Sequence, residues 1–273
     1  MSATAERAKV IVRNDPWADS GLCLALGWQL AVQQLRVRYR GSVLGYVWTM
    51  VYPLLLLLTY ALVFSSLFGA HTYAGSPLAS FSAVFFAWLF ISSTMNDAVY
   101  SVSQSSALLH QTHFPLWLLP FSTTLANLIS FFLSLPVVMA ILLSVHVLPG
   151  WHLLLVIPLS LLLFCFTFGL SLLISLLSVF FRDMPHIIGI AVTMLFFLSP
   201  VFYTMDYIHG QALLHAIVVG NPISYFLEIA RTCFLGSGTP LWIWGGCMAW
   251  SLGTLGVGVV SFSRFSSDLG MRV

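Results

Sequence analysis

Three arginines stand close together, at Arg36, Arg38 and Arg40, and arginine is well suited to binding phosphate. Its planar guanidinium group forms paired hydrogen bonds to phosphate oxygens, which the ammonium group of lysine does not. On a helix, Arg36 and Arg40 lie one turn apart on the same face, whereas Arg38 points to a different face. We therefore predict that Arg36 and Arg40 bind a phosphate-containing headgroup, and that Arg38 anchors a membrane span or contacts a partner subunit.

Residues for other kinds of chemistry are scarce. The single lysine is Lys9, so the chain has no G-x-x-x-x-G-K-[ST] phosphate loop and is not expected to bind ATP. The eight acidic residues are scattered, whereas a membrane-embedded enzyme typically clusters its polar residues at the membrane surface. Asp97 follows Asn96 near the end of an apolar segment, and we interpret it as a hydrogen-bonding group rather than a proton carrier. We expect no catalytic residue and no cofactor bound by this chain.

The four cysteines give no sign of a metal site. Cys23, Cys165, Cys233 and Cys247 form no C-x-x-C pair and lack the spacing of metal ligands. We interpret them as packing residues, and a disulfide bond between Cys233 and Cys247 remains open. No metal site is expected.

The composition indicates a protein that crosses a membrane several times. The mean hydropathy is +0.98 and only 7% of the residues are charged, whereas soluble domains carry roughly 25%. The net charge of +2 says little about partners, because placement of charge matters more than its sum in a membrane protein. We expect no nucleic-acid partner. The N-terminus lacks an apolar core followed by a cleavage site, so no cleaved signal peptide is expected.

Charge-free intervals leave room for six spans, because a helix needs about 20 apolar residues to cross the hydrocarbon region. These intervals are residues 41–96, 98–181, 184–205 and 232–263. Polar turns, such as the one containing Pro149 and Gly150, divide the longer ones. The predicted spans lie near residues 44–68, 78–99, 119–144, 152–179, 186–203 and 241–262. They form a transmembrane domain over residues 41–263, followed by a cytoplasmic tail over residues 264–273.

Six spans place both termini on one side of the membrane, and the positive-inside rule selects the cytoplasmic side. With this orientation only Arg231 lies outside, and nine basic residues lie inside: Arg7, Lys9, Arg13, Arg36, Arg38, Arg40, Arg182, Arg264 and Arg272. We predict a multi-pass protein of a bacterial cytoplasmic membrane with cytoplasmic termini. The alternative explanation for Arg36, Arg38 and Arg40 is that they only fix the topology, through the positive-inside effect and through attraction to anionic lipids. This attraction contributes about 1 kcal/mol for each arginine.

A polar leader and an amphipathic helix precede the first span. Residues 1–21 are polar and poorly patterned, and the predicted helix covers residues 22–40. One face carries Gln29, Gln33, Arg36 and Arg40, and the other carries Leu24, Trp28, Ala31, Val32, Leu35 and Tyr39. Such a helix, placed directly before a span, is expected to lie in the membrane interface. The alternative is a soluble helix packed on a partner subunit.

Four short motifs follow one another in register. They are Arg38-Tyr39-Arg40-Gly41-Ser42-x-Leu44-Gly45-x-x-Trp48-x-x-x-x-Pro53, then Phe114-Pro115 with Leu119-Pro120, then Phe181-Arg182-Asp183, and finally Ser199-Pro200-Val201-Phe202-Tyr203 with Asn221-Pro222. Over residues 30–262 the chain therefore resembles the permeases of ATP-binding-cassette exporters that move polysaccharides, including O-antigen, capsule and teichoic acid. One departure is that His110 and His113 stand where that family usually has basic residues.

The resemblance implies a homodimer that works with two copies of a separate ATP-binding-cassette ATPase, which uses ATP and Mg. It also implies a short coupling helix within residues 103–118 that contacts this ATPase. The candidate coupling residues are Leu108, Leu109, His110, His113, Phe114, Pro115, Arg182 and Asp183. For Arg182, an anchor at the end of a span is the alternative. The expected cargo is a glycan linked to a lipid pyrophosphate, whose headgroup Arg36 and Arg40 would bind.

The segment from residue 204 to residue 239 is predicted to contain a helix that begins at Asn221. Asn221 is a plausible N-cap with Pro222 at the first helical position, and an apolar stripe follows at helical spacing. The stripe consists of Ile223, Phe226, Leu227, Ala230 and Phe234. The resemblance implies short re-entrant or interfacial helices here. Glu228 and Arg231 are spaced to pair, either on a rim exposed to sugars or as a structural ion pair.

Aromatic side chains are candidates for stacking on sugar rings along a channel. Tyr60 and Tyr203 are the better candidates because a phenol has a polar group that lipid does not satisfy. The other candidates are Phe85, Phe86, Trp88, Phe90, Phe196, Phe197 and Phe202. Packing inside the protein or against lipid is the alternative for each of them.

The sequence therefore predicts an all-α membrane protein: six transmembrane helices preceded by an amphipathic interfacial helix. The predicted function is that of a permease subunit exporting a lipid-linked polysaccharide, with O-antigen as the first choice. The alternatives are a permease for a smaller amphiphile, such as a drug or lipid, and an integral membrane enzyme of glycan or lipid metabolism.

Overall fold

The chain is built of helices. The computed structural model describes residues 20–38, 40–42, 45–68, 77–103, 115–204, 212–236 and 238–272, and no strand occurs in these ranges. The elements are α2 (Ser20–Arg38), η1 (Gly45–Val47), α3 (Trp48–Phe68), α4 (Pro77–Ser101), α6 (Leu118–Ser144), η4 (Trp151–Leu155), α7 (Val156–Phe180), α8 (Met184–Leu198), α9 (Ala212–Gly220), α10 (Pro222–Leu235) and α11 (Leu241–Arg272). The predicted all-α fold is confirmed.

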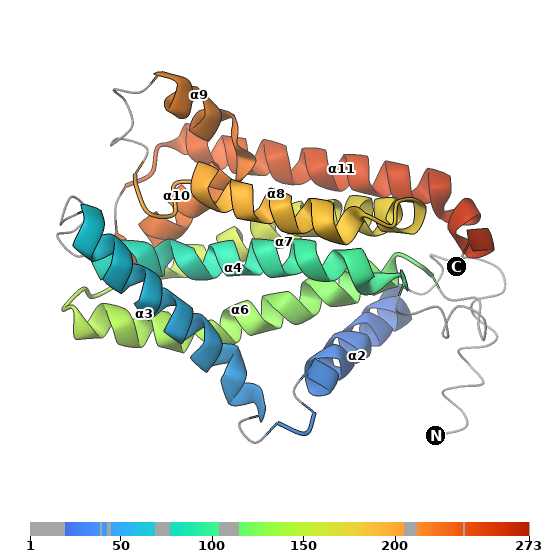
Figure 1. Ribbon diagram of the computed structural model, residues 1–273, viewed down its shortest axis with the longest axis horizontal. Helices are drawn as coiled ribbons and strands as arrows, with labels where there is room; N and C mark the ends of the chain where they lie inside the picture. The colour runs from blue at the N-terminus through green and yellow to red at the C-terminus, as the bar shows by residue number, and fades with distance from the viewer. Residues whose placement is uncertain are drawn as a thin grey trace.

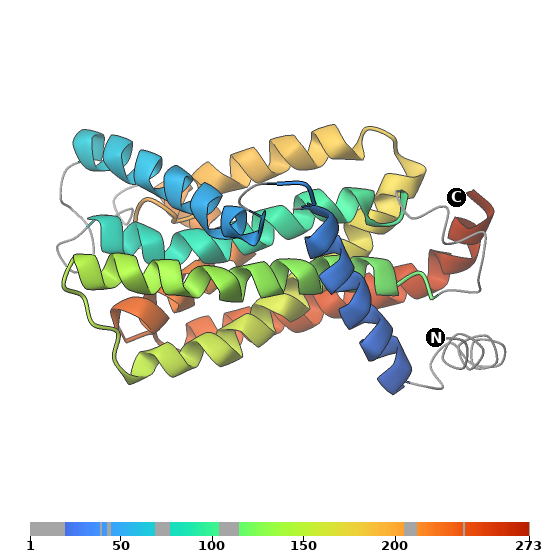
Figure 2. The same ribbon diagram turned by 90° about the horizontal axis from the view of Figure 1, so that it is seen from below.

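The helices α3, α4, α6, α7, α8 and α11 run back and forth along the long axis of the molecule (Figures 1 and 2). Each of them coincides with one predicted span. Among the described residues, α4, α6, α11 and the η4–α7 pair are long and apolar enough to cross a membrane. The bent pair α9–α10 adds a fifth candidate if it counts as one span. Helix α8 has 15 residues, fewer than the about 20 that a span requires, so the count of six stays a prediction.

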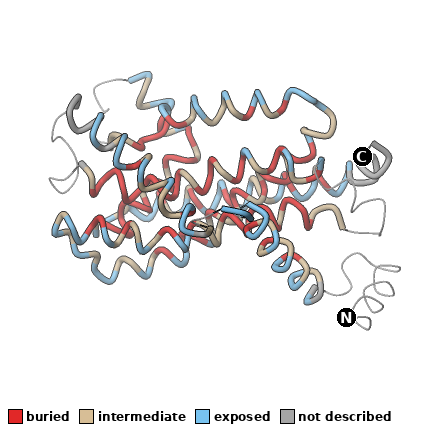
Figure 3. The backbone as a smooth tube through the Cα atoms, turned by 60° about the horizontal axis from the view of Figure 1, so that its bottom comes forward, coloured by how far each residue is buried: buried red, intermediate tan, exposed pale blue. Residues whose placement is uncertain are grey.

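Helix α4 lies at the centre of the bundle. It contacts α3, α6, α7, α8 and α10, and most of its residues are buried. The buried residues gather in the middle of the bundle (Figure 3), whereas most residues of α11 between 241 and 265 are exposed. Its aromatic side chains Phe85, Phe86, Trp88 and Phe90 are all buried in the core. Packing inside the protein therefore accounts for these four rings within one chain.

Buried hydroxyl groups bond to the backbone of their own helices. Thr94 donates to the carbonyl oxygen of Phe90 at 2.7 Å, and Thr167 donates to that of Leu163 at 2.8 Å. Such bonds allow Ser and Thr in an apolar helix because the hydroxyl needs no water. Polar residues on these spans are therefore compatible with a membrane location.

Helices α9 and α10 meet at an angle of 84° on either side of Asn221. The Asn221 side chain accepts a hydrogen bond from the Ile223 amide at 3.0 Å, and Pro222 occupies the first helical position. The whole predicted apolar stripe of α10 is buried. Gly236, with φ of 73°, ends the helix in the left-handed conformation that glycine adopts readily. The predicted N-cap, helix and apolar stripe are confirmed.

Several helix limits differ from the predictions. Helix α8 ends at Leu198 instead of residue 203. Helix α2 ends at Arg38 instead of residue 40, and the chain turns at Gly41, whose φ is 80°. Helix α11 continues to Arg272, beyond the predicted span end at residue 262. The turn before Trp48 places α2 at an angle to the main bundle (Figure 2).

Helices α7 and α11 pack with their backbones in close approach. A Cβ atom added to Gly169 would lie 2.4 Å from the Thr254 carbonyl carbon, and one added to Gly258 would lie 2.5 Å from the Gly169 oxygen. Ser251 on α11 also donates a hydrogen bond to the Leu162 carbonyl on α7 at 2.9 Å. Because lipid gives no hydrophobic driving force between helices, close packing of small residues is what holds such a pair together.

This packing predicts different effects for two glycines on α11. Gly258→Ala pushes a methyl group into backbone, which should destabilise the chain by about 1–3 kcal/mol, whereas Gly256→Ala meets open space. We expect the apparent melting temperature in detergent, followed by size-exclusion chromatography after heating, to fall only for Gly258→Ala. Equal melting temperatures for the two variants would contradict the packing described here.

Candidate functional site

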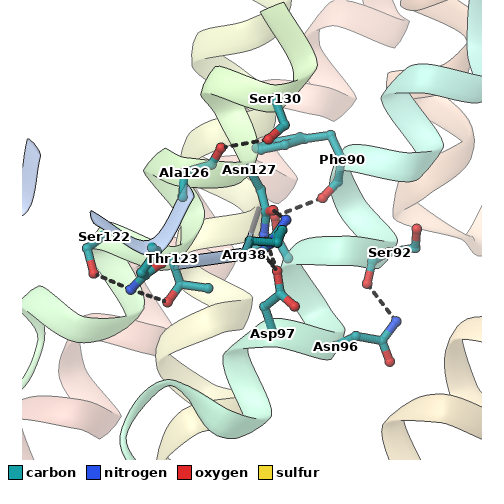
Figure 4. Close-up of polar contacts among 12 residues, drawn as sticks. Arg38, Phe90, Ser92, Asn96, Asp97, Ser122, Thr123, Ala126, Asn127 and Ser130 are labelled. Carbon is teal, nitrogen blue, oxygen red and sulfur yellow. Dashed lines mark hydrogen bonds and ion pairs between the residues drawn. The ribbon is translucent and has the colours of Figure 1, made fainter. Parts of the chain in front are cut away.

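Arg38 joins three helices at the end of the bundle where α2 lies. Its Nη2 atom lies 2.7 Å from Asp97 Oδ2 on α4, and its Nη1 atom donates to Asn127 Oδ1 on α6 at 3.3 Å (Figure 4). Asn127 Nδ2 also donates to Asp97 Oδ2 at 2.9 Å, so the three side chains form a closed triangle. We call these three residues the Arg38 cluster.

The rest of α2 explains why Arg38 reaches this position. One turn earlier, Gln34 donates to Ser122 Oγ at 3.0 Å and to Thr123 Oγ1 at 3.4 Å, both on α6. Ala31 and Leu35 on the same side are buried in a small cluster with α6. Small and apolar residues therefore bring α2 close to α6, and the polar side chains at its end are directed at α4 and α6.

The predicted apolar face of α2 is buried only in part. Ala31 and Leu35 on that face pack on α6, whereas Leu24 and Trp28 on the same face are exposed. Since α2 packs on its own chain, contact with a partner subunit is not needed to cover Ala31 and Leu35.

The Arg38 cluster is only partly shielded from solvent. The side chains of Arg38 and Asp97 are 37% and 36% exposed, whereas Asn127 is buried. A partly exposed ion pair of this kind contributes up to about 1 kcal/mol, and the buried amide adds hydrogen bonds to both charges. The charges of Arg38 and Asp97 cancel, so the cluster as a whole is neutral.

Two hollows adjoin Arg38. A cavity of about 380 Å³ lies between α3, α4 and α6, and its wall is rich in the rings of Trp48, Tyr52, Phe90 and Phe131. A second hollow of about 510 Å³ lies between α2, α4 and α6. We call the second hollow the α2–α4 cleft. Its polar lining consists of Gln33, Gln34, Arg38, Asp97, Tyr100, Ser101 and Thr123.

The structure corrects the predicted geometry of the arginines. Arg40 lies after the end of α2, so Arg36 and Arg40 do not share a helical turn. Both are exposed, and neither lines one of the two hollows. The side chain of Arg38 binds Asp97 and Asn127 within the chain, and its predicted role as a span anchor or a contact to a partner subunit stays a prediction. Headgroup binding by Arg36 and Arg40 stays a prediction.

Sequence reasoning missed the partners of Arg38. One signal was present: Asp97 is the only charged residue between Arg40 and Arg182, and an ionisable group near a span interior normally has a partner. Asn127 stands inside the third predicted span, where an amide also needs a partner. Their pairing with Arg38 depends on which helices are neighbours.

Several predicted channel residues gather in an aromatic cluster at the other end of the bundle. The Tyr60 ring centroid lies 5.5 Å from that of Phe196 and 5.9 Å from that of Phe202. Phe197 is exposed, with its ring centroid 5.4 Å from that of Phe196, and Tyr203 donates to the Phe197 carbonyl at 3.4 Å. A role of these residues in a channel stays a prediction.

The predicted pair of Glu228 and Arg231 is present, with 3.0 Å between Oε2 and Nη1. Arg231 is fully buried and not exposed on a rim. Its Nη2 atom donates to the carbonyl oxygens of Pro200 and Tyr203 at 2.8 and 2.9 Å, and its Nε donates to Ser80 Oγ at 3.4 Å. The geometry agrees with a structural ion pair that joins α10 to α4 and to the turn after α8.

The predicted coupling residues Leu108, Leu109, His110, His113 and Phe114 lie outside the described residues. Pro115 is half-buried before α6, and Arg182 and Asp183 are exposed in the turn between α7 and α8. Their contact with an ATPase stays a prediction.

All four cysteines carry free thiols in this structure. The disulfide bond that the sequence left open between Cys233 and Cys247 is therefore not formed here, and both side chains are buried. Among the described residues no group of His, Cys, Asp or Glu has the arrangement of a metal site.

The chain matches a known protein family over most of its length. Residues 26–235 match the model of the ABC-2 type transporter family. The O-antigen export system permease protein RfbA of Myxococcus xanthus is 30% identical over 205 residues, which are 75% of this chain and 78% of that protein. Two proteins of the same name from Klebsiella pneumoniae are each 26% identical over 204 residues, which are 74% of this chain and 77% of theirs.

The Arg38 cluster predicts coupling between Arg38 and Asp97. Arg38→Gln or Asp97→Asn alone leaves one charge without its partner, so each should lower the apparent melting temperature by about 2–4 °C, as expected for about 1 kcal/mol in a chain of this size. The double variant should lose less than the sum of the two. Arg36→Gln, on the exposed side of α2, serves as the control and should have no effect. Additive losses in the double variant would contradict the pairing.

Proposed function

Because this chain belongs to the ABC-2 type transporter family, we propose that it is the permease subunit of an ATP-driven exporter for a lipid-linked polysaccharide of the O-antigen type. The observation that carries the proposal is the similarity to three relatives that are all O-antigen export permeases. The similarity extends over about three quarters of each chain. The family also supports a transport subunit over a membrane enzyme.

The energy for transport comes from a separate subunit in this proposal. The chain has one lysine, Lys9, and no Walker phosphate loop, so ATP and Mg are used by a partner ATPase. Two copies of that ATPase would bind a permease homodimer. The exposed turn with Arg182 and Asp183, and the segment that precedes Pro115, are the proposed contacts.

Six spans with cytoplasmic termini are supported by the positions of the basic residues. Arg36 and Arg38 are near the end of α2, Arg182 lies between α7 and α8, and Arg264 is near the end of α11. The turn between α7 and α8 and the end of α11 lie at the same end of the bundle, and α2 lies in the same half of the molecule (Figures 1 and 2). Arg231 belongs to α10, which lies at the opposite end (Figure 1). The arrangement follows the positive-inside rule if the end with α2 faces the cytoplasm of a bacterial inner membrane.

The surfaces of α3 and α8 support a homodimer. Leu55 and Leu62 on α3 are exposed, as are Ile190, Met194 and Phe197 on α8. Helix α8 is also short for a span, so contact with another protein chain would complete its surroundings better than lipid. We propose that a polysaccharide path forms where two copies meet. Tyr60, Tyr203, Phe196, Phe197 and Glu228 are near its outer end in this proposal.

In this proposal, Arg36 and Arg40 bind the pyrophosphate headgroup of the lipid-linked glycan. Both side chains are exposed at the end of the bundle where the membrane interface is expected, so a lipid pyrophosphate of the inner leaflet can reach them. Their guanidinium groups are separated by the turn after Arg38, and they would bind the two phosphates from different sides.

Deletion of the gene tests the proposed function. We expect the glycan to disappear from the cell surface while it continues to be made inside, because assembly and export are separate steps. Antibody labelling of intact cells, compared with immunoblots of whole lysates, measures the two pools. Restoration by the intact gene is the control, and normal surface labelling in the deletion strain would contradict the proposal.

Replacement of Arg36 and Arg40 by lysine tests the headgroup site. Lysine keeps the charge and hence the topology, but it loses the paired hydrogen bonds to phosphate. The double variant should reach the membrane at the normal level and export glycan several-fold more slowly, measured as the rate of surface labelling after induction. Export at the wild-type rate would show that these arginines only fix the topology.

A further inference from the structure

We infer that the α2–α4 cleft binds a sugar ring of the exported glycan on the side of the membrane where α2 lies. The inference rests on the proposed function and assigns a sugar site to each permease chain. This site is distinct from the headgroup site at Arg36 and Arg40, because neither residue lines the cleft.

The charge of the cleft favours a neutral ligand. Arg38 is its only cation among the described lining residues, and it already forms an ion pair with Asp97 at 2.7 Å. A phosphate entering the cleft would lie against the Asp97 carboxylate, and like charges at close distance repel one another. A neutral sugar ring meets no such repulsion.

The hydrogen-bonding groups of the cleft match a polyol. Every sugar hydroxyl is both a donor and an acceptor, so a sugar site needs both functions side by side. Arg38 supplies donors, Asp97 supplies acceptors, and the amide of Gln33 supplies both. Arg38 and Asp97 each keep more than a third of their side-chain surface exposed, so they remain open to a ligand while bonded to each other.

These polar groups are held in place before a ligand arrives. The buried Asn127 bonds to both members of the ion pair, and Gln34 is bonded to Ser122 and Thr123. Fixing the donors and acceptors in advance reduces the entropy lost on binding. The sugar would therefore meet a rigid polar wall formed by α2, α4 and α6.

Tyr100 supplies an apolar surface in the same cleft. It lies one turn after Asp97 on α4, lines the cleft and is 45% exposed. The C–H face of a sugar ring is apolar and stacks on aromatic rings, while the hydroxyl groups around its edge remain free to form hydrogen bonds. A polar wall with one exposed ring beside it is the combination that distinguishes a sugar site from a site for an ion.

Binding of lipid-free oligosaccharide to the purified full-length chain in nanodiscs tests the inference. The probe is an oligosaccharide released from the glycan that the same cells export, free of lipid and phosphate, and inorganic pyrophosphate is the comparison probe. Tyr100→Ala should weaken oligosaccharide binding about five-fold, the order expected for the loss of one aromatic contact. The control is Phe265→Ala, which removes an aromatic ring of similar exposure, 48%, from α11, outside the cleft. It should bind like the wild type.

If the alanine variant does not fold, Tyr100→Leu replaces it, because leucine keeps an apolar side chain of some size but has no aromatic ring. Its oligosaccharide binding should also be weaker than that of the wild type. Three outcomes would overturn the inference: no oligosaccharide binding by the wild type, equal binding by the Tyr100 variant and the wild type, or displacement of the oligosaccharide by pyrophosphate. None of these outcomes affects the deletion experiment. If the binding experiment fails but deletion of the gene still removes the glycan from the cell surface, the sugar site is refuted and the proposed function is not.

Discussion

The constraint on which this structure depends is that a bilayer provides no water to satisfy polar groups. An unpaired polar group in that environment costs several kcal/mol, so each one must find its partner inside the protein. Hydroxyl groups such as that of Thr167 bond to their own helix. The buried Arg231 pairs with Glu228 on its own helix, and it also donates to Ser80 and to two backbone carbonyl groups outside that helix.

The same constraint places one polar network at each end of the bundle. At one end, the Arg38 cluster fixes α2 to α4 and α6. At the other end, Arg231 and Asn221 hold the turn after α8 against α10, because Asn221 also donates to Ser199 Oγ at 2.8 Å. Between the two ends the helices contact one another mainly through apolar and small residues. The polar networks therefore fix the positions of the elements that are not held by a long apolar interface.

Polar networks at the two ends of the bundle, with apolar contacts between them, suit a polysaccharide permease. A long polar polymer must be received on one side and released on the other, so residues that contact sugar belong near the two ends. The Arg38 cluster is neutral as a whole and partly exposed beside a polar cleft, which are properties that suit contact with sugar hydroxyl groups. The core around α4 is packed with aromatic side chains, among them the buried Phe85, Phe86 and Phe90. A path between two copies is consistent with that.

The sequence by itself determined what depends on local spacing and composition. Helix positions followed from apolar length, and the N-cap at Asn221, the buried stripe of α10 and the pairing of Glu228 with Arg231 followed from helical periodicity, which acts over a few residues. Only the tertiary structure decided which of the three arginines is bonded within the protein. Arg38 meets Asp97 and Asn127 across 59 and 89 positions of the chain. That contact depends on how α2, α4 and α6 pack. The periodicity within one helix does not indicate which other helices are its neighbours.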